Sequence, residues 1–243
     1  MNSRELLAVL KDQVESKYNE LGLLSLKGIK LDGKDLVVHF SDVFRSRQTL
    51  KDNLISDFQY FEELAFLSED LLYVTSLLNI LKENITDSSR GKYHQTWEDH
   101  IYLRYASFGF QVIYNYWDRL GDLLHLFFKT GLSDDHVYFQ RVINNFPANN
   151  RSGTYEEMVG LYKSKVAPWF IVRNEVVHHF GLKTYHVWGT INNNNDAEKC
   201  VALQKEKESY ADLFIEHLSI FHQAFILTVR LIEELPEVDH TDN

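Results

Sequence analysis

The sequence predicts an all-α fold, a helical bundle of long antiparallel helices with a small N-terminal β-hairpin. The 243 residues include only 3 prolines and 11 glycines, too few turn residues for a sandwich or barrel of many short strands. Apolar residues also recur at three- and four-residue intervals over long stretches, as on the buried face of an amphipathic helix. With 44% hydrophobic residues, the chain can bury a sizeable core.

The first 51 residues are expected to form an appendage of one helix and one hairpin. Apolar residues at helical spacing predict a helix over residues 3–21, and Gly22 is its natural stop. From Ile29 to Phe40, two short β-rich runs flank an Asp32-Gly33 turn, which predicts a β-hairpin.

Residues 52–235 are expected to form the bundle, followed by a disordered acidic tail over residues 236–243. The apolar periodicity and the Gly, Pro and polar stops between periodic stretches predict helices over residues 52–81, 93–129, 133–145, 154–180 and 196–234. Pro168 should kink or break the fourth of these helices. After Gly181, residues 183–188 are expected to form a short strand, and residues 192–195 a turn.

Composition restricts the class of protein. A formal net charge of -10 argues against a broad nucleic-acid-binding surface, because Lys and Arg provide that affinity, so no DNA partner is expected. The single Cys200 cannot form an internal disulfide. No signal peptide and no uninterrupted apolar run of membrane-spanning length is evident, so a cytoplasmic protein without membrane contact is expected.

The stretch from residue 171 to 180 carries the most informative polar residues. Arg173, Asn174 and His178 interrupt a helical pattern that is otherwise apolar. At about 100° per residue, Asn174 and His178 lie about 40° apart on one helix face, with Arg173 reaching from the flank. Arginine binds phosphoryl oxygens with a rigid fork of donors, and histidine is suited to proton transfer near neutral pH. The set is therefore suited to phosphate chemistry.

An Arg-Asn-x-x-x-His pattern on a late helix of a bundle resembles the HEPN superfamily (higher eukaryotes and prokaryotes nucleotide-binding). Arg173, Asn174 and His178 carry the resemblance. A second segment, residues 116–124 with Tyr116, Trp117 and Asp118, resembles the aromatic-Asp segment of several branches of that family. The resemblance covers roughly residues 52–234.

The resemblance implies a homodimer in which two such motifs face each other and, in active members, cleave RNA without a metal or cofactor. His178 would act as general acid or base and Arg173 would stabilise charge on the phosphate, while Asn174 would orient the phosphate or His178. The substrate's own 2′-hydroxyl would be the nucleophile, which confines the reaction to RNA. Asp118, Glu175 and His179 are supporting candidates.

Structural roles compete with each of these assignments. Arg173 could instead pair with Glu175, Asp118 or Asp122, and His178 could be a satisfied interior histidine. Asp118, beside Trp117, should need a partner, which would be Arg173, Arg119 or a backbone donor. His179 is more typical of a surface residue than of a catalyst.

Two other classes of function compete with RNA cleavage. Glu175 and His178 also fit the Glu-x-x-His pattern of di-iron bundles, but the sequence holds no second copy of it, so no metal site is expected. The main alternative is a non-catalytic module that binds a nucleotide-like ligand or partners a nucleotidyltransferase in a toxin–antitoxin or defence system. Aromatic residues that could stack on bases fit either function, although at helical spacing such residues are more often core: Tyr102, Tyr105, Tyr114, Tyr116, Trp169 and Trp188.

Overall fold

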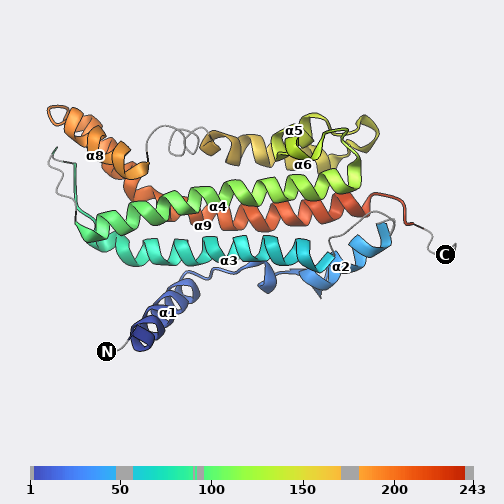
Figure 1. Cartoon of the computed structure of the whole chain (residues 1–243), viewed down its shortest axis with the longest axis horizontal. Coiled ribbons are helices and arrows are strands. Elements are labelled where there is room, and N and C mark those ends of the chain that lie inside the picture. Colours follow the sequence, from blue (N-terminus) through green and yellow to red (C-terminus); the bar gives the residue numbers. More distant parts are fainter. Residues whose placement is uncertain (1–2, 48–56, 90, 92–95, 171–180, 239–243) are drawn as a thin grey trace. The chain divides into compact units, whose positions relative to one another are not determined.

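The computed structural model describes residues 3–47, 57–89, 91, 96–170 and 181–238 (Figure 1). Regular structure in these residues is helical except for one two-stranded sheet, which confirms the predicted all-α class and its small hairpin. The chain divides into two compact units. Unit 1 comprises Met1–Leu23, Asp70–Val112 and Trp169–Leu218, and unit 2 comprises Leu24–Glu69, Ile113–Pro168 and Ser219–Asn243. Three long helices, α3 (Asp57–Leu81), α4 (Trp97–Phe128) and α9 (Ala197–Glu233), contribute residues to both units.

Unit 1 contains α1 (Ser3–Glu20), α8 (Leu182–Asn192) and parts of the three long helices. Helix α1 ends as predicted at Gly22, whose φ of +64° favours glycine and lets the Leu23 N–H donate to the Tyr18 carbonyl at 2.9 Å. In the core, the Phe110 ring meets the rings of Tyr210 and Phe214 edge-on, at centroid distances of 5.5 and 5.2 Å. These aromatic contacts join α4 to α9.

The start of α4 in unit 1 is fixed by a capping box. The Asp99 N–H donates to Thr96 Oγ1 at 3.2 Å, and the Thr96 N–H donates to Asp99 Oδ2 at 3.1 Å. The Lys207 ammonium of α9 lies 3.3 Å from Asp99 Oδ1, and both side chains are almost completely buried. One carboxylate therefore caps α4 and neutralises a buried cation.

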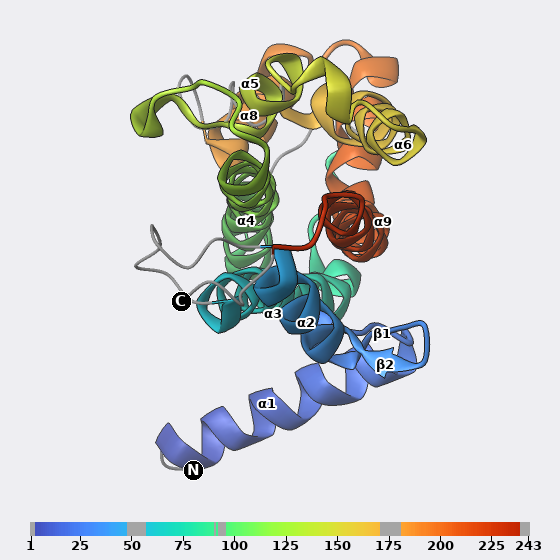
Figure 2. The same ribbon diagram turned by 90° about the vertical axis from the view of Figure 1, so that its right-hand side faces the viewer.

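Unit 2 begins with the 3-10 turn η1 (Leu26–Gly28) and the antiparallel strands β1 (Lys30–Leu31) and β2 (Lys34–Asp35), beside which α2 (Leu36–Arg47) lies (Figure 2). Later elements of the unit are the short helices α5 (Phe139–Asn144) and α6 (Gly153–Leu161), with the 3-10 turns η3 (Asp134–His136) and η4 (Ala148–Asn150) before them. The Trp117 ring packs edge-on against Phe139 and Tyr162, at centroid distances of 4.5 and 5.3 Å. These contacts hold α5 and the chain after α6 against the second half of α4.

The predicted strands were wrong in two places. Residues 36–40, expected in the second hairpin strand, begin α2, because Leu36 and Phe40 are buried one helical turn apart. Residues 183–188, expected to be a strand, lie in α8, where Leu182 and His186 are likewise buried at helical spacing. Over five or six residues, alternation cannot distinguish a strand from a short helix.

The structure also differs from two of the predicted helices. The single helix expected over residues 133–145 is a 3-10 turn, an extended link at Val137 and Tyr138, and the short α5. The disturbance expected at Pro168 takes the form of a π-helical turn, η5 (Tyr162–Val166), directly before it. Pro168 cannot donate a backbone hydrogen bond, and its ring would crowd the carbonyl four residues earlier, which the wider turn relieves.

Two helical stretches of the described chain, residues 59–84 and Ala197–Glu233, are long and apolar enough to cross a membrane by length and composition. More than half of the most apolar window in each is buried within the fold. Core helices of globular proteins pass the same test, so these stretches are weak evidence for membrane contact.

Candidate functional site

The predicted catalytic motif lies outside the described residues. Arg173, Asn174 and His178, together with the supporting candidates Glu175 and His179, all fall in residues 171–180. Asp118 is the one predicted site residue that the structure describes. The described part of the predicted site is residues 116–124 of α4, which include Tyr116, Trp117 and Asp118 and which we call the aromatic-acid segment.

Two fully buried aromatic residues fix the position of this segment in unit 2. The Tyr116 ring stacks on Phe221 at a centroid distance of 3.6 Å, and its hydroxyl donates to the Phe221 carbonyl at 2.8 Å. Trp117 points toward Phe139 and Tyr162. With both rings held, the half-buried Asp118 that follows has little freedom to move.

The Asp118 carboxylate is held by neutral donors. It accepts hydrogen bonds from the Phe139 N–H and the Tyr114 side chain. Of the partners expected for it, a backbone donor is thus present, and Arg119 acts only through its charge. The pKa of Asp118 is raised to about 6, chiefly by burial and also by the charge of Asp122, while these hydrogen bonds and the charge of Arg119 oppose the rise. Asp118 is therefore poised to exchange a proton near neutral pH.

A glycine makes the Asp118–Phe139 hydrogen bond possible. Gly121 lies on the buried face of α4, where a Cβ atom would stand 2.8 Å from the Phe139 nitrogen and 2.9 Å from its Cα. Contacts this short to backbone atoms cannot be relieved by a side-chain rotation. Gly121 thus allows the start of α5 to approach α4 closely enough for its N–H to reach Asp118.

Asp118→Asn is expected to raise the free energy of unfolding at pH 7 by about 1 kcal/mol. Because the pKa of this carboxyl is raised on folding, its favourable contribution is complete below its ordinary value of 3.8 and is lost as pH rises through about 6. Asparagine resembles the neutral acid, so its advantage should disappear below pH 4. Urea unfolding at pH 7 and pH 3.5 measures the difference.

The control for this prediction is Asp135→Asn, at a side chain that is 78% exposed. It should change the free energy of unfolding by less than about 0.5 kcal/mol at either pH. An Asp118→Asn variant that is equally stabilised at both pH values, or destabilised at pH 7, would contradict the assignment of a raised pKa.

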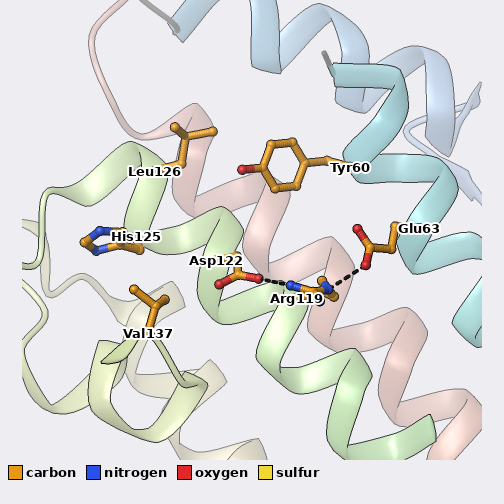
Figure 3. A pocket seen from close by; sticks show the side chains of 7 residues that line it. All are labelled: Tyr60, Glu63, Arg119, Asp122, His125, Leu126 and Val137. Atoms are coloured by element: carbon orange, nitrogen blue, oxygen red, sulfur yellow. Dashed lines mark hydrogen bonds and ion pairs between the residues drawn. The ribbon is translucent and has the colours of Figure 1, made fainter. Parts of the chain in front are cut away.

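Next to this segment, unit 2 contains a cavity of about 270 Å³ (Figure 3). Its lining combines α3, α4 and the link before α5: Tyr60, Glu63, Arg119, Asp122, His125, Leu126 and Val137. Figure 3 shows the Arg119 guanidinium between two carboxylates. Its Nε lies 2.6 Å from Glu63 Oε1, and a terminal nitrogen lies 2.5 Å from Asp122 Oδ2.

The ion pairs determine what this cavity can bind. Burial raises the pKa of Asp122, although the hydrogen bond and charge of Arg119 oppose the rise. Burial, with the charges of Asp122 and Glu63, also raises the pKa of the Tyr60 hydroxyl, which therefore stays protonated near neutral pH. His125 Nδ1 is engaged by Thr130 Oγ1 at 2.6 Å. Two carboxylates facing one guanidinium disfavour a phosphate, so this cavity offers hydrogen bonds and acidic groups instead.

Sequence reasoning missed Tyr60, Glu63 and His125 as site residues. Tyr60 and Glu63 lie on α3, more than fifty residues before Arg119, so no local pattern joins them to it. The spacing of Arg119, Asp122 and His125 on α4 was a usable signal, because residues three and four apart share a helix face. In the part of the chain that the structure describes, no group of three or more His, Cys, Asp or Glu side chains could hold a metal ion.

Comparison with known proteins gives one finding. The family model described as Cthe2314-like HEPN matches residues 70–233. Neither the curated proteins nor the solved structures include a significant match. The matched range contains both the aromatic-acid segment of α4 and the Arg173-Asn174-x-x-x-His178 motif.

Proposed function

The chain belongs to the Cthe2314-like HEPN family, and we propose that it is a metal-independent endoribonuclease that cleaves RNA by attack of the substrate's own 2′-hydroxyl. The observation that carries this proposal is the Arg173-Asn174-x-x-x-His178 motif within the matched range. Family membership by itself supports nucleotide binding or RNA cleavage. The residue types of the motif favour cleavage.

Each motif residue has one role in the proposed reaction. His178 removes the proton from the 2′-hydroxyl or gives one to the leaving 5′-oxygen, and a second base or acid completes the transfer. Arg173 stabilises the negative charge that builds on the phosphorane-like transition state. Asn174 orients the phosphate or His178 by hydrogen bonding. The 2′-oxygen bonds to phosphorus as the 5′-oxygen leaves, so the products are a 2′,3′-cyclic phosphate and a 5′-hydroxyl.

Two further expectations concern the oligomeric state of the protein and its location in the cell. We expect a homodimer that brings two motifs to one cleft, because the family resemblance implies that arrangement. We also expect the protein to act in the cytoplasm, where RNA substrates are present. Light scattering of the purified chain measures the first expectation.

The test is cleavage of a mixed panel of end-labelled RNAs in the presence of EDTA. Wild type should release fragments with 2′,3′-cyclic phosphate ends, and Arg173→Ala and His178→Ala should each lower the rate at least about 100-fold. Arg230→Ala and His136→Ala are matched controls at exposed positions outside the motif, and they should cleave like wild type. Folded, dimeric wild-type protein that cleaves no RNA in the panel would overturn the proposal.

A second candidate is a non-catalytic module that binds a nucleotide-like ligand or partners a nucleotidyltransferase in a toxin–antitoxin or defence system. Two observations favour it. The guanidinium in the α4 cavity is paired with two carboxylates, and the chain carries a formal net charge of -10. Both disfavour an anionic polymer as ligand. A stable complex with a co-expressed nucleotidyltransferase, together with inactivity toward RNA, would support this function instead.

A further inference from the structure

The first half of α4, within unit 1, carries an unusual exposed face. Trp97, His100, Arg104 and Phe108 are three or four residues apart, which places them within an arc of about 80° on the helix. Trp97 is 71% exposed and Phe108 is 45% exposed, and Arg104 is also exposed. The opposite face of the same turns is buried. We call these four residues the α4 stripe.

The α4 stripe places one cation, Arg104, between aromatic groups. The rings of Trp97 and His100 lie 5.8 Å apart, and Arg104 follows one turn later, before Phe108. The free energy falls when large aromatic side chains leave water. Two of them exposed on one helix face therefore indicate a binding surface.

Arg104 differs from two other arginines of the described chain. Arg119 is paired with Glu63 and Asp122, and Arg47 is paired with Glu237. Among the described residues, no carboxylate lies within ion-pair distance of Arg104. Its donors are therefore available to an anion, in a protein whose overall charge is negative.

We propose that the α4 stripe binds single-stranded RNA, with bases stacked on Trp97 and Phe108 and a phosphate paired with Arg104. Unpaired bases stack on exposed aromatic rings regardless of sequence, and interleaved cations hold the backbone. Trp97 and Phe108 are separated by about 16 Å along the helix axis, which leaves room for several nucleotides between the two rings. The inference rests on the proposed function in taking RNA as the ligand, but it concerns a surface outside the predicted catalytic motif.

A second copy of the chain fits the α4 stripe less well. In a two-fold symmetric contact between antiparallel helices centred on the stripe, Arg104 would lie close to Arg104 of the other copy. Two guanidinium groups would then be desolvated next to each other without a carboxylate between them, which is unfavourable. A nucleic acid supplies the missing negative charge. Duplex is disfavoured because its bases are already stacked and paired.

The test measures binding, with cleavage blocked by His178→Ala in the full chain. The probe is a short, end-labelled single-stranded RNA of mixed sequence, followed by fluorescence anisotropy. Trp97→Ala and Phe108→Ala should each weaken binding by roughly 5- to 150-fold. Arg104→Ala should also weaken binding and should lower the slope of log affinity against log salt by about 0.7, whereas Arg104→Lys should keep that slope.

Matched controls separate the α4 stripe from other exposed groups. Phe66→Ala replaces a 55% exposed phenylalanine on α3, and Arg230→Ala replaces an exposed arginine on α9. Both should bind RNA like the parent protein. Circular dichroism and the urea midpoint should match the parent for every variant, because the changed side chains are on the surface.

The outcomes distinguish this inference from the proposed function. RNA binding that depends on the α4 stripe supports the inference even if wild type cleaves nothing, a result that would overturn only the proposed function. Cleavage or binding that is unchanged in the stripe variants overturns the inference and leaves the proposed function standing. Absence of RNA binding overturns the inference. If a stripe variant has a lower molar mass than the parent when measured in solution without RNA, and the same RNA affinity, that result overturns the inference in favour of a protein partner.

Discussion

Asp99→Ala is expected to lower the free energy of unfolding by about 3–5 kcal/mol. Removing this carboxylate takes its negative charge away from the buried Lys207 ammonium, which lies 3.3 Å from Asp99 Oδ1 and also donates to the Thr86 carbonyl at 2.6 Å. It also removes one half of the capping box with Thr96 at the start of α4. Urea unfolding monitored by circular dichroism measures the loss.

The pH dependence of stability gives a second measurement on Asp99. Burial by itself would raise the pKa of Asp99, but hydrogen bonds from Thr86 and Thr96 and the charge of Lys207 lower it below 3.8. The stabilisation is therefore complete above pH 3.8 and is lost as pH falls through the lowered value. Wild type and Asp99→Ala should converge in stability in strong acid.

The matched control is another Asp–Lys pair of unit 1. Asp212 Oδ2 lies 3.0 Å from the Lys82 ammonium, but the Asp212 side chain is 67% exposed. Asp212→Ala should cost about 0–1 kcal/mol, because water solvates either partner when the other is lost. Equal losses for the two variants would show that burial of the Asp99 pair contributes nothing, and would contradict the prediction.

Gly121→Ala is expected to lower the free energy of unfolding by about 1–3 kcal/mol. The added methyl group would meet the backbone of Phe139, so α5 must shift away from α4. That shift lengthens the hydrogen bond from the Phe139 N–H to Asp118, whose pKa should then rise further, because this hydrogen bond lowers it. Urea unfolding reports the stability, and the carboxyl carbon chemical shift of Asp118 in an NMR titration reports the pKa.

The same substitution should have the opposite sign at Gly160. This residue is on the exposed face of α6, and a Cβ atom there meets nothing within 4 Å. Gly160→Ala should raise the free energy of unfolding by about 0.5–1 kcal/mol, because alanine loses less backbone entropy than glycine in a helix. A neutral or stabilising Gly121→Ala would show that α4 and α5 are less closely packed than described.

If the Gly121→Ala prediction holds, the pKa of Asp118 depends on the close packing of α5 against α4. A carboxylate with a pKa of about 6 next to an acidic cavity is suited to proton exchange. Gly121 allows the Phe139 N–H to approach this carboxylate. A single methyl group at residue 121 would then change the pKa of Asp118 through the hydrogen bond from the Phe139 N–H. The Asp118→Asn measurement tests the raised pKa independently.

Sequence periodicity was sufficient for most helices but not for short elements. The stop at Gly22 was correct, the turn expected over residues 192–195 is present over residues 193–195, and the last helix, α9, was correct. Residues 36–40 and 183–188 were wrongly expected to be strands, because five or six residues complete too few helical turns for the period to show. Their type is decided by which side chains find a core to enter.

The sequence by itself determined the all-α class, the family and the residues of the proposed catalytic motif, since each depends on residue types only a few positions apart. The partners of the polar groups were decided by tertiary structure alone. Arg119 pairs with Glu63, and Asp99 pairs with Lys207 more than one hundred residues away. Such pairs form only where helices distant in sequence pack together, and the burial of each pair then sets how strongly it stabilises the fold.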